Sequence, residues 1–469
     1  MREPLPPPAP PGPDELTPTY AEHAWLAAVV PADARRFRVA DPALARTLRY
    51  AGAELVEDGA EVEIGRPEDL SGRAPVAIVT LNTGVPNVPS RVRQVVRRLA
   101  WSAEARARAE LVRRQLRRRG YPHVRVIPWD VEQVLRLPGA PSAPHVRTSE
   151  RFPRRALLVA GRAPMRATAL DAATAAAAAA SGDRSAATWP LLRAGSLLAI
   201  ADATVLRVAI GPGRERIDRQ AGVLAGLAAA IEDGPLAGVV PALLATGDAG
   251  LARWSVERRL PGAHAPERIP PGLLADCLGF LDALERCGDA DGEPVTAAAR
   301  AEALGRLVPG RASELAAIGA RVDAATAPLG RVFGHGDFWS DNLLVRDGRL
   351  AGVVDWESAG PGRLPLLDLF QLTLVGRMGG DPYAWGRVVV EYLLPACRRG
   401  GDDVVRASLR RTGRDPGPEG LEALALAYWL DRATSQLTAH VGRLGDRAWM
   451  DSNVELVLAA VSAGAGGRR

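Results

Sequence analysis

The stretch that decides the fold is Gly334-His335-Gly336-Asp337-Phe338-Trp339-Ser340-Asp341-Asn342, followed by two apolar runs and Asp355. Arg346-Asp347-Gly348-Arg349 separates the two apolar runs. An Asp-Gly pair between two β-prone runs is a strong short-range indication of a β-hairpin. Such a hairpin brings the loop with Asp337 and Asn342 next to the strand end with Asp355. Two carboxylates and one amide are then expected to converge.

This group of side chains suits phosphoryl transfer. Magnesium takes oxygen ligands and is commonly held by one or two protein carboxylates together with substrate phosphates. Transfer from ATP also requires an Asp that orients and deprotonates the acceptor hydroxyl. Taken singly, Asp337 and Asn342 are typical turn residues and Asp355 a typical strand-end cap. The joint pattern favours a site.

These residues resemble the catalytic loop and metal-binding strand of the aminoglycoside phosphotransferase and choline kinase-like family, relatives of the protein kinases. The resemblance implies that Asp337 is the catalytic base and that Asn342 and Asp355 bind Mg²⁺, with ATP as the phosphate donor. His335 is implied to brace the loop rather than to take part in the chemistry.

The chain departs from the protein-kinase pattern, which is H-R-D-x-x-x-x-N followed by D-F-G. Gly336 replaces the arginine, and Trp356-Glu357 follows Asp355. Only a short connection, Pro361 to Asp368, takes the place of a long activation loop, so a small-molecule acceptor is expected. Asp368 matches a structural aspartate of the family and is predicted to cap the helix that begins at Leu369.

The length and composition indicate a globular protein of several domains. A chain of 469 residues is long enough for two or three domains, and 47% hydrophobic with 24% charged residues is a globular balance. No run of about 18 apolar residues predicts a membrane-spanning helix. The proline-rich start lacks the pattern of a signal peptide, so residues 1–20 are expected to be a disordered tail. Cys277, Cys287 and Cys397 follow no metal-binding spacing and are interpreted as incidental thiols of a cytoplasmic protein.

All 59 basic side chains are arginines, because the sequence contains no lysine. Any basic residue that anchors ATP must therefore be an arginine. The net charge of +5 permits anionic ligands but does not by itself indicate nucleic acid. The predicted helix Arg91–Arg119 carries eleven arginines. Because arginine is the only basic residue used throughout the sequence, a solvated helix face is favoured over a contact with an anionic surface. It lacks the interleaved aromatics of a base-stacking surface, so no nucleic-acid partner is expected.

Residues 21–150 alternate between strand and helix patterns. Strands are expected at residues 36–40, 53–56, 61–64, 75–81 and 123–127, with a short helix at 42–50. The run at 75–81 is of the type buried in a parallel sheet. We therefore predict a Rossmann-like α/β domain, faintly similar to a reduced methyltransferase-type domain. The segment contains no G-x-G-x-x-G, so nucleotide binding there has no support from a motif. Residues 151–188, with a strand at 156–160 and an alanine-rich helix, are predicted to be a connector.

Residues 189–261 read as the small lobe of a protein-kinase-like fold. The resemblance places Arg207, on a strand, where the family has its phosphate-pairing basic residue. Gly195 and Ser196 are candidates for a phosphate-binding turn. The following helix should supply an acidic partner for Arg207, but Gln220 stands at that position. Glu215 and Asp218 lie nearby without matching it.

Residues 262–469 are predicted to be a helical large lobe, so the expected fold is an α/β Rossmann-like domain plus an α+β two-lobed phosphotransferase. The resemblance covers residues 189–463. Between the lobes, Glu257 to Gly262 resembles the family's hinge, whose backbone would contact adenine, which makes Glu257 and Arg259 candidates for nucleotide binding. Trp339, Trp356, Trp429 and Asp431 are candidates for an acceptor pocket, with a buried core position for Trp429 and a surface position for Asp431 as the alternative.

Three hypotheses follow. The first is an ATP- and Mg²⁺-dependent kinase that acts on a hydroxyl of a small molecule such as an aminoglycoside, an amino alcohol or a sugar. The second is a nucleotide-sensing module in which Gln220 marks lost catalysis. The third places the activity in the N-terminal domain, as a degenerate methyltransferase scaffold.

Overall fold

The computed structural model describes residues 23–82, 107–129, 155–164, 166–183, 191–193, 195–287, 293–378, 381, 384–439 and 441–466. The described residues fall into two compact units. One unit, the sheet unit, comprises residues up to 222 together with 242–259. The other, the helical unit, comprises residues 223–241 and those from 260 onward.

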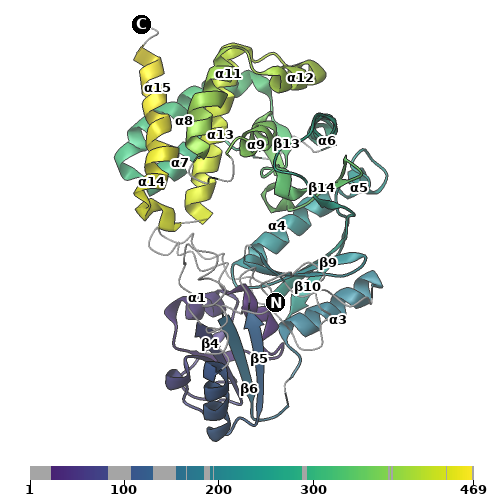
Figure 1. Ribbon diagram of the computed structural model, residues 1–469, viewed down its shortest axis with the longest axis vertical. Helices are drawn as coiled ribbons and strands as arrows, with labels where there is room; N and C mark the ends of the chain where they lie inside the picture. Colours follow the sequence, from purple (N-terminus) through teal and green to yellow (C-terminus); the bar gives the residue numbers. More distant parts are fainter. Residues whose placement is uncertain are drawn as a thin grey trace, which may run out of the picture. The chain divides into compact units, whose positions relative to one another are not determined.

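A six-stranded mixed sheet forms the N-terminal part of the sheet unit (Figure 1). Its strand order is β2-β1-β3-β4-β6-β5. The first four strands in that order are parallel, whereas β6 runs antiparallel to both of its neighbours. The elements are β1 (Arg36–Val39), α1 (Pro42–Tyr50), β2 (Glu54–Leu55), β3 (Val62–Gly65), η3 (Pro67–Asp69), β4 (Val76–Asn82), β5 (His123–Trp129) and β6 (Arg155–Gly161), preceded by η2 (Ala24–Ala28).

The predicted strands and the helix at 42–50 are present, and α1 begins where Asp41 caps it. The Asp41 carboxylate accepts hydrogen bonds from the amides of Ala43 and Leu44, and Pro42 occupies the first turn. The predicted boundary at residue 150 is wrong, because β6 lies inside the sheet between β4 and β5. The Rossmann-like assignment remains a prediction. Of the predicted helix Arg91–Arg119, only residues 107–118 are described as helical; its first part and the tail 1–20 lie outside the described residues.

The two faces of this sheet belong to two different cores. On β4, Ile78 faces one cluster of buried residues and Val79 faces the other, as the two-residue period of a strand requires. The same alternation separates Val159 from Leu158 on β6. The smaller cluster includes Leu116 from the helix at 107–118. The larger cluster extends beyond the six-stranded sheet.

A five-stranded antiparallel sheet forms the rest of the sheet unit, in the order β10-β11-β9-β8-β7. Three strands, two helices and two strands follow one another in the chain, whereas a single helix was expected after the third strand. They are β7 (Leu191–Arg193), β8 (Ser196–Ile200), β9 (Thr204–Ile210), α4 (Gly213–Gly226), α5 (Ala228–Glu232), β10 (Leu243–Ala249) and β11 (Ala252–Arg258).

The larger core is shared by the two sheets. It joins Leu26 of η2 and Leu48 of α1 to Leu206 and Val208 of β9 and Trp254 of β11, all at most 6% exposed. The predicted connector helix, α3 (Ala169–Ser181), packs on β9, β10 and β11 and contributes to this core (Figure 1). It is bounded by a capping box and by a left-handed glycine. The segment predicted as a connector is therefore an integral part of the sheet unit.

The helical unit has the helices predicted for a large lobe. Helices α7, α8 and α13 pack on one another (Figure 1). The helices are α6 (Pro271–Cys287), α7 (Ala297–Leu307), α8 (Ala312–Thr326), α9 (Leu367–Val375), α10 (Trp385–Val388), α11 (Leu394–Arg398), α12 (Asp403–Thr412), α13 (Gly417–Ala439), α14 (Arg447–Met450) and α15 (Leu456–Gly466), with short turns η5 (Pro309–Arg311), η6 (Ala327–Leu329), η7 (Ser340–Asn342), η8 (Trp356–Ser358) and η10 (Val441–Gly445) and π-helical turns η9 (Val389–Leu393) and η11 (Asp451–Glu455).

Two small sheets in the helical unit carry the stretch that decides the fold. β12 (Ala263–His264), β14 (Leu343–Arg346) and β15 (Arg349–Val353) form one, and β13 (Val332–Gly334) pairs with β16 (Gly360–Arg363) in the other. The predicted hairpin is confirmed, since Arg346 pairs with Arg349 across the turn. Asp347 and Gly348 in that turn have φ of 54° and 75°, as a type I′ turn requires.

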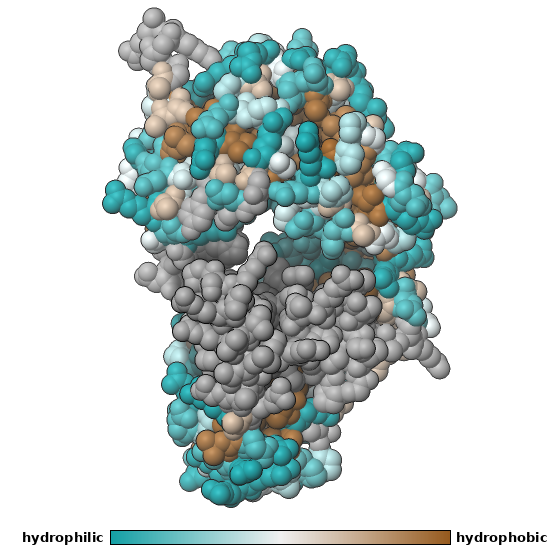
Figure 2. Space-filling view, in the orientation of Figure 1, coloured by the Kyte–Doolittle hydropathy of each residue, from teal (hydrophilic) through white to brown (hydrophobic). Residues whose placement is uncertain are grey.

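The outer surface mixes hydrophilic residues with smaller hydrophobic areas on the face that Figure 2 shows. Among the described residues, the exposed large hydrophobic side chains are Tyr50, Leu111 and Leu456. The part of the chain that the structure describes contains no helix long and apolar enough to span a membrane.

Candidate active site

The loop after β13 is held by a carboxylate from α9. The Asp368 side chain accepts hydrogen bonds from the backbone amides of His335, at 2.7 Å, and Gly336, at 2.8 Å. The prediction that Asp368 caps the following helix is wrong: Leu366 is the N-cap of α9, and no side chain caps it. Asp368 instead accepts hydrogen bonds from two loop amides, which fixes the start of the loop.

Gly336 stands where protein kinases have arginine, and the space around it admits no side chain. Its φ of 79° is in the left-handed region. A Cβ there would lie 2.4 Å from the carbonyl oxygen of Ser358 and 2.5 Å from the guanidinium of Arg363. That guanidinium donates to the Ser358 carbonyl. A downstream arginine from β16 therefore occupies the place beside the loop.

His335 joins the loop to the strand that precedes Asp355. The amide of Asp337 donates to His335 Nδ1 at 3.3 Å, so Nδ1 carries the lone pair and Nε2 carries the proton, which it donates to the carbonyl oxygen of Val354 at 3.1 Å. Burial lowers the pKa of His335, against the opposing charges of nearby carboxylates including Asp368. A neutral imidazole fits both hydrogen bonds, and it agrees with the bracing role expected for His335.

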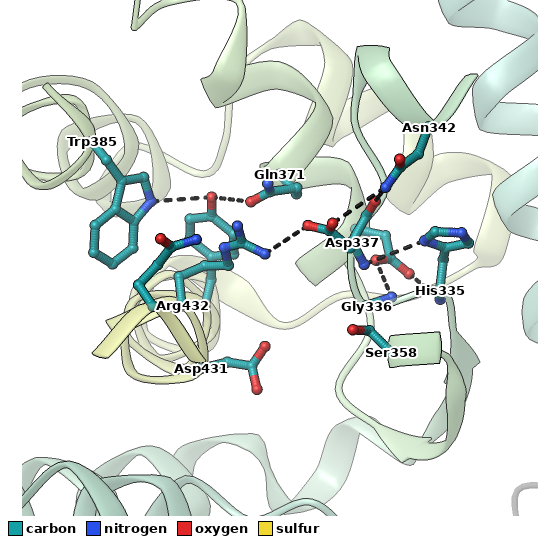
Figure 3. A network of polar contacts seen from close by, with 12 residues as sticks. His335, Gly336, Asp337, Asn342, Ser358, Gln371, Trp385, Asp431 and Arg432 are labelled. Atoms are coloured by element: carbon teal, nitrogen blue, oxygen red, sulfur yellow. Dashed lines mark hydrogen bonds and ion pairs between the residues drawn. The ribbon is translucent and has the colours of Figure 1, made fainter. Parts of the chain in front are cut away.

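Asp337 receives a donor at each carboxylate oxygen (Figure 3). The guanidinium of Arg432, on α13, donates to Oδ1 at 2.8 Å, and the amide of Asn342 donates to Oδ2 at 3.2 Å. Each oxygen keeps a further acceptor site, because a carboxylate oxygen has two lone pairs. The side chain is 29% exposed. Asp337 is thus oriented but still able to accept a proton.

Arg432 was not anticipated from the sequence. Burial lowers the pKa of Arg432, but Asp337, Tyr428 and Asp431 together raise it by more, so that the net shift is upward. Arg432 lies four residues after Tyr428 and so on the same face of its helix. Arg432 also directly follows Asp431, which was a candidate for the acceptor pocket, so the sequence had pointed to this part of the helix.

Asn342 and Asp355 are brought together by the hairpin. The amide of Val354 donates to the carbonyl oxygen of Asn342 at 2.9 Å, which places Asp355 beside the start of β14. The Asn342 side-chain amide nitrogen also donates to the Asp337 carbonyl oxygen at 2.8 Å, so its own oxygen is turned away from Asp337 (Figure 3). Asp355 adopts a left-handed conformation, with φ of 70°, which Asp tolerates better than most residues.

Asn342 and Asp355 offer an amide oxygen and a carboxylate, which are donors that Mg²⁺ prefers. Within the described ranges, no group of three or more His, Cys, Asp or Glu side chains could hold a metal ion. This observation is compatible with a kinase-type site, in which substrate phosphates complete the coordination. The residues present therefore fit magnesium.

The predicted acceptor pocket is largely wrong. Trp356 and Trp429 are fully buried, and their indole N–H groups donate to the carbonyl oxygens of Val353 and Asn453. Both are core residues, as the alternative interpretation held for Trp429.

Asp431 is 13% exposed and lies between two arginines, with Arg300 at 2.8 Å and Arg363 at 3.8 Å. The charge of Asp431 is therefore balanced by arginines of the protein itself. Of the four candidates only Trp339 remains, half-buried in the loop with Asp337.

Arg207 has an acidic partner, which comes from an unexpected element. Its Nε lies 3.5 Å from Oε1 of Glu257 on β11. Gln220, on α4, donates to the same oxygen at 2.5 Å. Glu257 was predicted to contact nucleotide in the hinge. Its side chain is instead buried and contacts Arg207 and Gln220.

The other nucleotide-binding candidates have internal roles. Gly195 and Ser196 lie in the tight β7–β8 turn, where both are buried and the Gly195 carbonyl packs against Gly213. Arg259 donates from its amide to Ala203 and from its guanidinium to Ala201. These contacts give no support to the predicted roles of Gly195, Ser196 and Arg259.

Comparison with known families gives a match to part of the chain. Residues 176–384 match the phosphotransferase enzyme family, which confirms the family named from the sequence and indicates a small-molecule kinase. No curated protein matches the chain.

Part of the chain is similar to several solved structures, three of which follow. A thermostable mutant of aminoglycoside phosphotransferase APH(4)-Ia is 20% identical and covers 58% of this chain and 91% of its own, with a TM-score of 0.35. A choline/ethanolamine kinase family protein from Mesorhizobium loti is 23% identical and covers 55% and 99%, with a TM-score of 0.35. The aminoglycoside phosphotransferase APH(3'')-Id from Streptomyces rimosus is 16% identical and covers 55% and 95%, with a TM-score of 0.35.

Proposed function

Because residues 176–384 match the phosphotransferase enzyme family, we propose that the protein transfers the γ-phosphate of ATP to a hydroxyl group of a small molecule, with Mg²⁺ as cofactor. The acceptor class is a hydroxyl compound such as an aminoglycoside, an amino alcohol or a sugar. The observation that carries the proposal is the convergence of Asp337, Asn342 and Asp355 on the hairpin and its loop. A reaction that consumes ATP is proposed to take place in the cytoplasm.

Asp337 is the proposed general base. Arg432 and Asn342 orient its carboxylate, and the remaining lone pairs accept the proton of the acceptor hydroxyl. His335 and Asp368 hold the loop that carries Asp337, so the base meets the acceptor without reorganisation. Trp339, in the same loop, is the proposed contact for the acceptor.

Asn342 and Asp355 are the proposed magnesium ligands. When bound, the ion would neutralise charge on the transferred phosphate. The protein's own part is to hold two oxygen ligands side by side, which the Val354–Asn342 backbone hydrogen bond supports. Arg207 is the proposed anchor for the nucleotide phosphates, since a guanidinium pairs well with phosphate oxygens.

The sensing hypothesis loses its main support. It rested on Gln220, which suggested that the phosphate anchor had lost its acidic partner. Glu257 supplies a carboxylate to Arg207, so the substitution at residue 220 does not by itself indicate lost catalysis.

The proposal is tested by calorimetric titration of ATP, with and without Mg²⁺, into the wild type and the Asp355→Asn variant. We expect magnesium-dependent binding in the wild type and its loss in the variant. The matched control is Asp347→Asn, because Asp347 is also in the left-handed region but lies exposed in the hairpin turn. Asn is tolerated at both positions, so folding should be retained.

The Asp337→Asn variant separates binding from chemistry. It should bind Mg·ATP with unchanged affinity and fail to release ADP with any acceptor that the wild type phosphorylates. Equal magnesium-dependent ATP binding in the wild type and Asp355→Asn would contradict the metal assignment, and normal turnover by Asp337→Asn would contradict the assignment of the base.

A further inference from the structure

Arg207 and Glu257 form their contact within one sheet. Arg207 on β9 is directly opposite Ser255 on β11, and Glu257 is two residues further along. Side chains two residues apart on a strand share a face, so Arg207 and Glu257 are diagonal neighbours on the same side of the sheet. The alternating residues Leu206, Val208 and Val256 face the shared core on the opposite side.

The carboxylate in this contact is deeply buried. The Glu257 side chain is 4% exposed and that of Arg207 is 13% exposed. Burying a carboxylate without a partner is strongly unfavourable, and a cation together with a hydrogen-bond donor removes most of that cost. Glu257 has both, because Arg207 lies at 3.5 Å and Gln220 donates at 2.5 Å.

Gln220 occupies the position at which the resemblance predicts an acid, but an amide carries no charge. It lies on α4 with 1% exposure. Its role in this geometry is to hydrogen-bond the carboxylate that comes from β11. Helix α4 is fastened to the β10–β11 hairpin by other contacts, namely Asp218 with Arg253 at 2.6 Å and Arg214 with Asp248 at 3.2 Å. The position of the helix and the charge that pairs with Arg207 are thus supplied by different residues.

We propose that Glu257, on β11, is the positioning residue for the phosphate anchor Arg207, and that the acid and the amide have exchanged elements relative to the resembled kinases. This inference rests on the proposed function, since it assumes that Arg207 binds nucleotide phosphate. In protein kinases the acid is on a mobile helix, and the anchor forms only when that helix is in place. Here Glu257 and Arg207 are on adjacent strands of one sheet, so their contact forms irrespective of the position of α4.

A swap of the two side chains tests this assignment. Glu257→Gln should weaken Mg·ATP binding at least about tenfold, because a charged partner of the anchor is lost. The double variant Gln220→Glu/Glu257→Gln keeps one acid and one amide in contact and should recover binding to within about threefold of the wild type. The single variant Gln220→Glu places two carboxylates together in a buried site and should lower the melting temperature, whereas the double variant should not.

The matched control is Glu215→Gln, because Glu215 is an exposed acid on the same helix. It should leave ATP affinity unchanged. If Glu257→Gln fails to fold, the double variant decides, since a folded double variant that binds ATP supports the swap and one that folds without binding overturns it. Wild-type affinity in Glu257→Gln overturns the assignment of Glu257 alone. No ATP binding by the wild type overturns the proposed function, and the assignment with it.

Discussion

His335 connects the two halves of the candidate active site through its neutral form. Its Nδ1 accepts from the amide of Asp337 and its Nε2 donates to Val354, next to Asp355. The ring is fully buried against Phe338 and Trp356. A proton on Nδ1 would remove the acceptor that the Asp337 amide requires. The geometry of the loop therefore depends on the protonation of this one side chain.

Because of His335, the free energy of unfolding should decrease as the pH drops below about 6.5. Burial lowers the pKa of His335 in the folded protein, whereas in the unfolded chain a histidine titrates near about 6.5. Below that pH the unfolded chain binds more protons, so acidification favours unfolding, by up to about 1.4 kcal/mol per pH unit. Urea unfolding at several pH values between about 5 and 8 measures this slope.

The variant His335→Gln separates this effect from the other titrating groups. Glutamine is buried without titrating, so its unfolding free energy should vary less with pH than that of the wild type. Parallel curves for the two proteins would show that His335 is not responsible.

The residues predicted from the sequence are those that lie close together in it. Asp337, Asn342 and Asp355 are separated by one hairpin, and the Asp-Gly turn alone fixed their proximity. Arg432 contacts Asp337 at 2.8 Å and Glu257 lies 3.5 Å from Arg207, but each of these partners comes from a distant part of the chain. No local pattern records such a partner, because its position is set by the packing of helices and the pairing of strands.

Helix α13 acts as the support behind the catalytic loop. It carries Arg432, which pairs with Asp337, and next to it Asp431, which pairs with Arg300 and Arg363. Arg363 in turn fills the space beside Gly336. One turn of this helix thus holds the loop from two sides through ion pairs that are largely buried.

Loss of the Arg432 contact should impair chemistry more than binding. In Arg432→Gln the carboxylate of Asp337 loses the donor at Oδ1, and misplacement of a base on this scale costs about 10²-fold in kcat. Affinity for Mg·ATP should change little. Steady-state kinetics measure the loss of kcat, and titration with Mg·ATP measures the affinity.

Arg398→Gln is the matched control, since Arg398, on α11, forms its ion pair with Glu422 of α13. It should retain wild-type kinetics. An unchanged kcat in Arg432→Gln would mean that the ion pair is incidental.

Elements with a strong local pattern were predicted well, but the sheet or domain to which each of them belongs was not. The apolar run of β6 is evident in the sequence, but its place between β4 and β5 follows from pairing with strands far away in the chain. The alanine-rich α3 was predicted as a helix, yet an alanine run does not indicate which sheet it covers. Local propensity fixes the type of an element, and tertiary contacts fix the domain to which it belongs.

At the scale of the molecule, the N-terminal sheet and the small-lobe sheet behave as one body in the sheet unit. Their common core contains buried residues from η2, α1, α3, β9 and β11. The turn between β9 and α4 is also braced by α1, since Gly211 packs directly against Thr47. The N-terminal region therefore supports the strand that carries Arg207.

This shared core predicts that damage in the N-terminal region loosens the small lobe. Leu48→Ala, in α1, removes a fully buried side chain from the common core and should cost about 2–5 kcal/mol. Amide hydrogen exchange in β9 and β11 should accelerate accordingly. Leu116→Ala is the matched control, because it makes the same change in the separate core on the other face of the six-stranded sheet. Equal exchange of β9 and β11 in Leu48→Ala and the wild type would indicate two independent domains.

The order in which the sheet unit is completed has a consequence for synthesis on the ribosome. The chain leaves this unit at residue 222 and returns to it only for residues 242–259. That return supplies β11, the strand between β9 and β10, and with it Trp254 and Val256 of the common core. A nascent chain that has not yet reached β11 therefore exposes the apolar faces of η2, α1 and β9. We expect ribosome-bound chains to recruit chaperones until β11 emerges, and products of premature termination before it to be degraded.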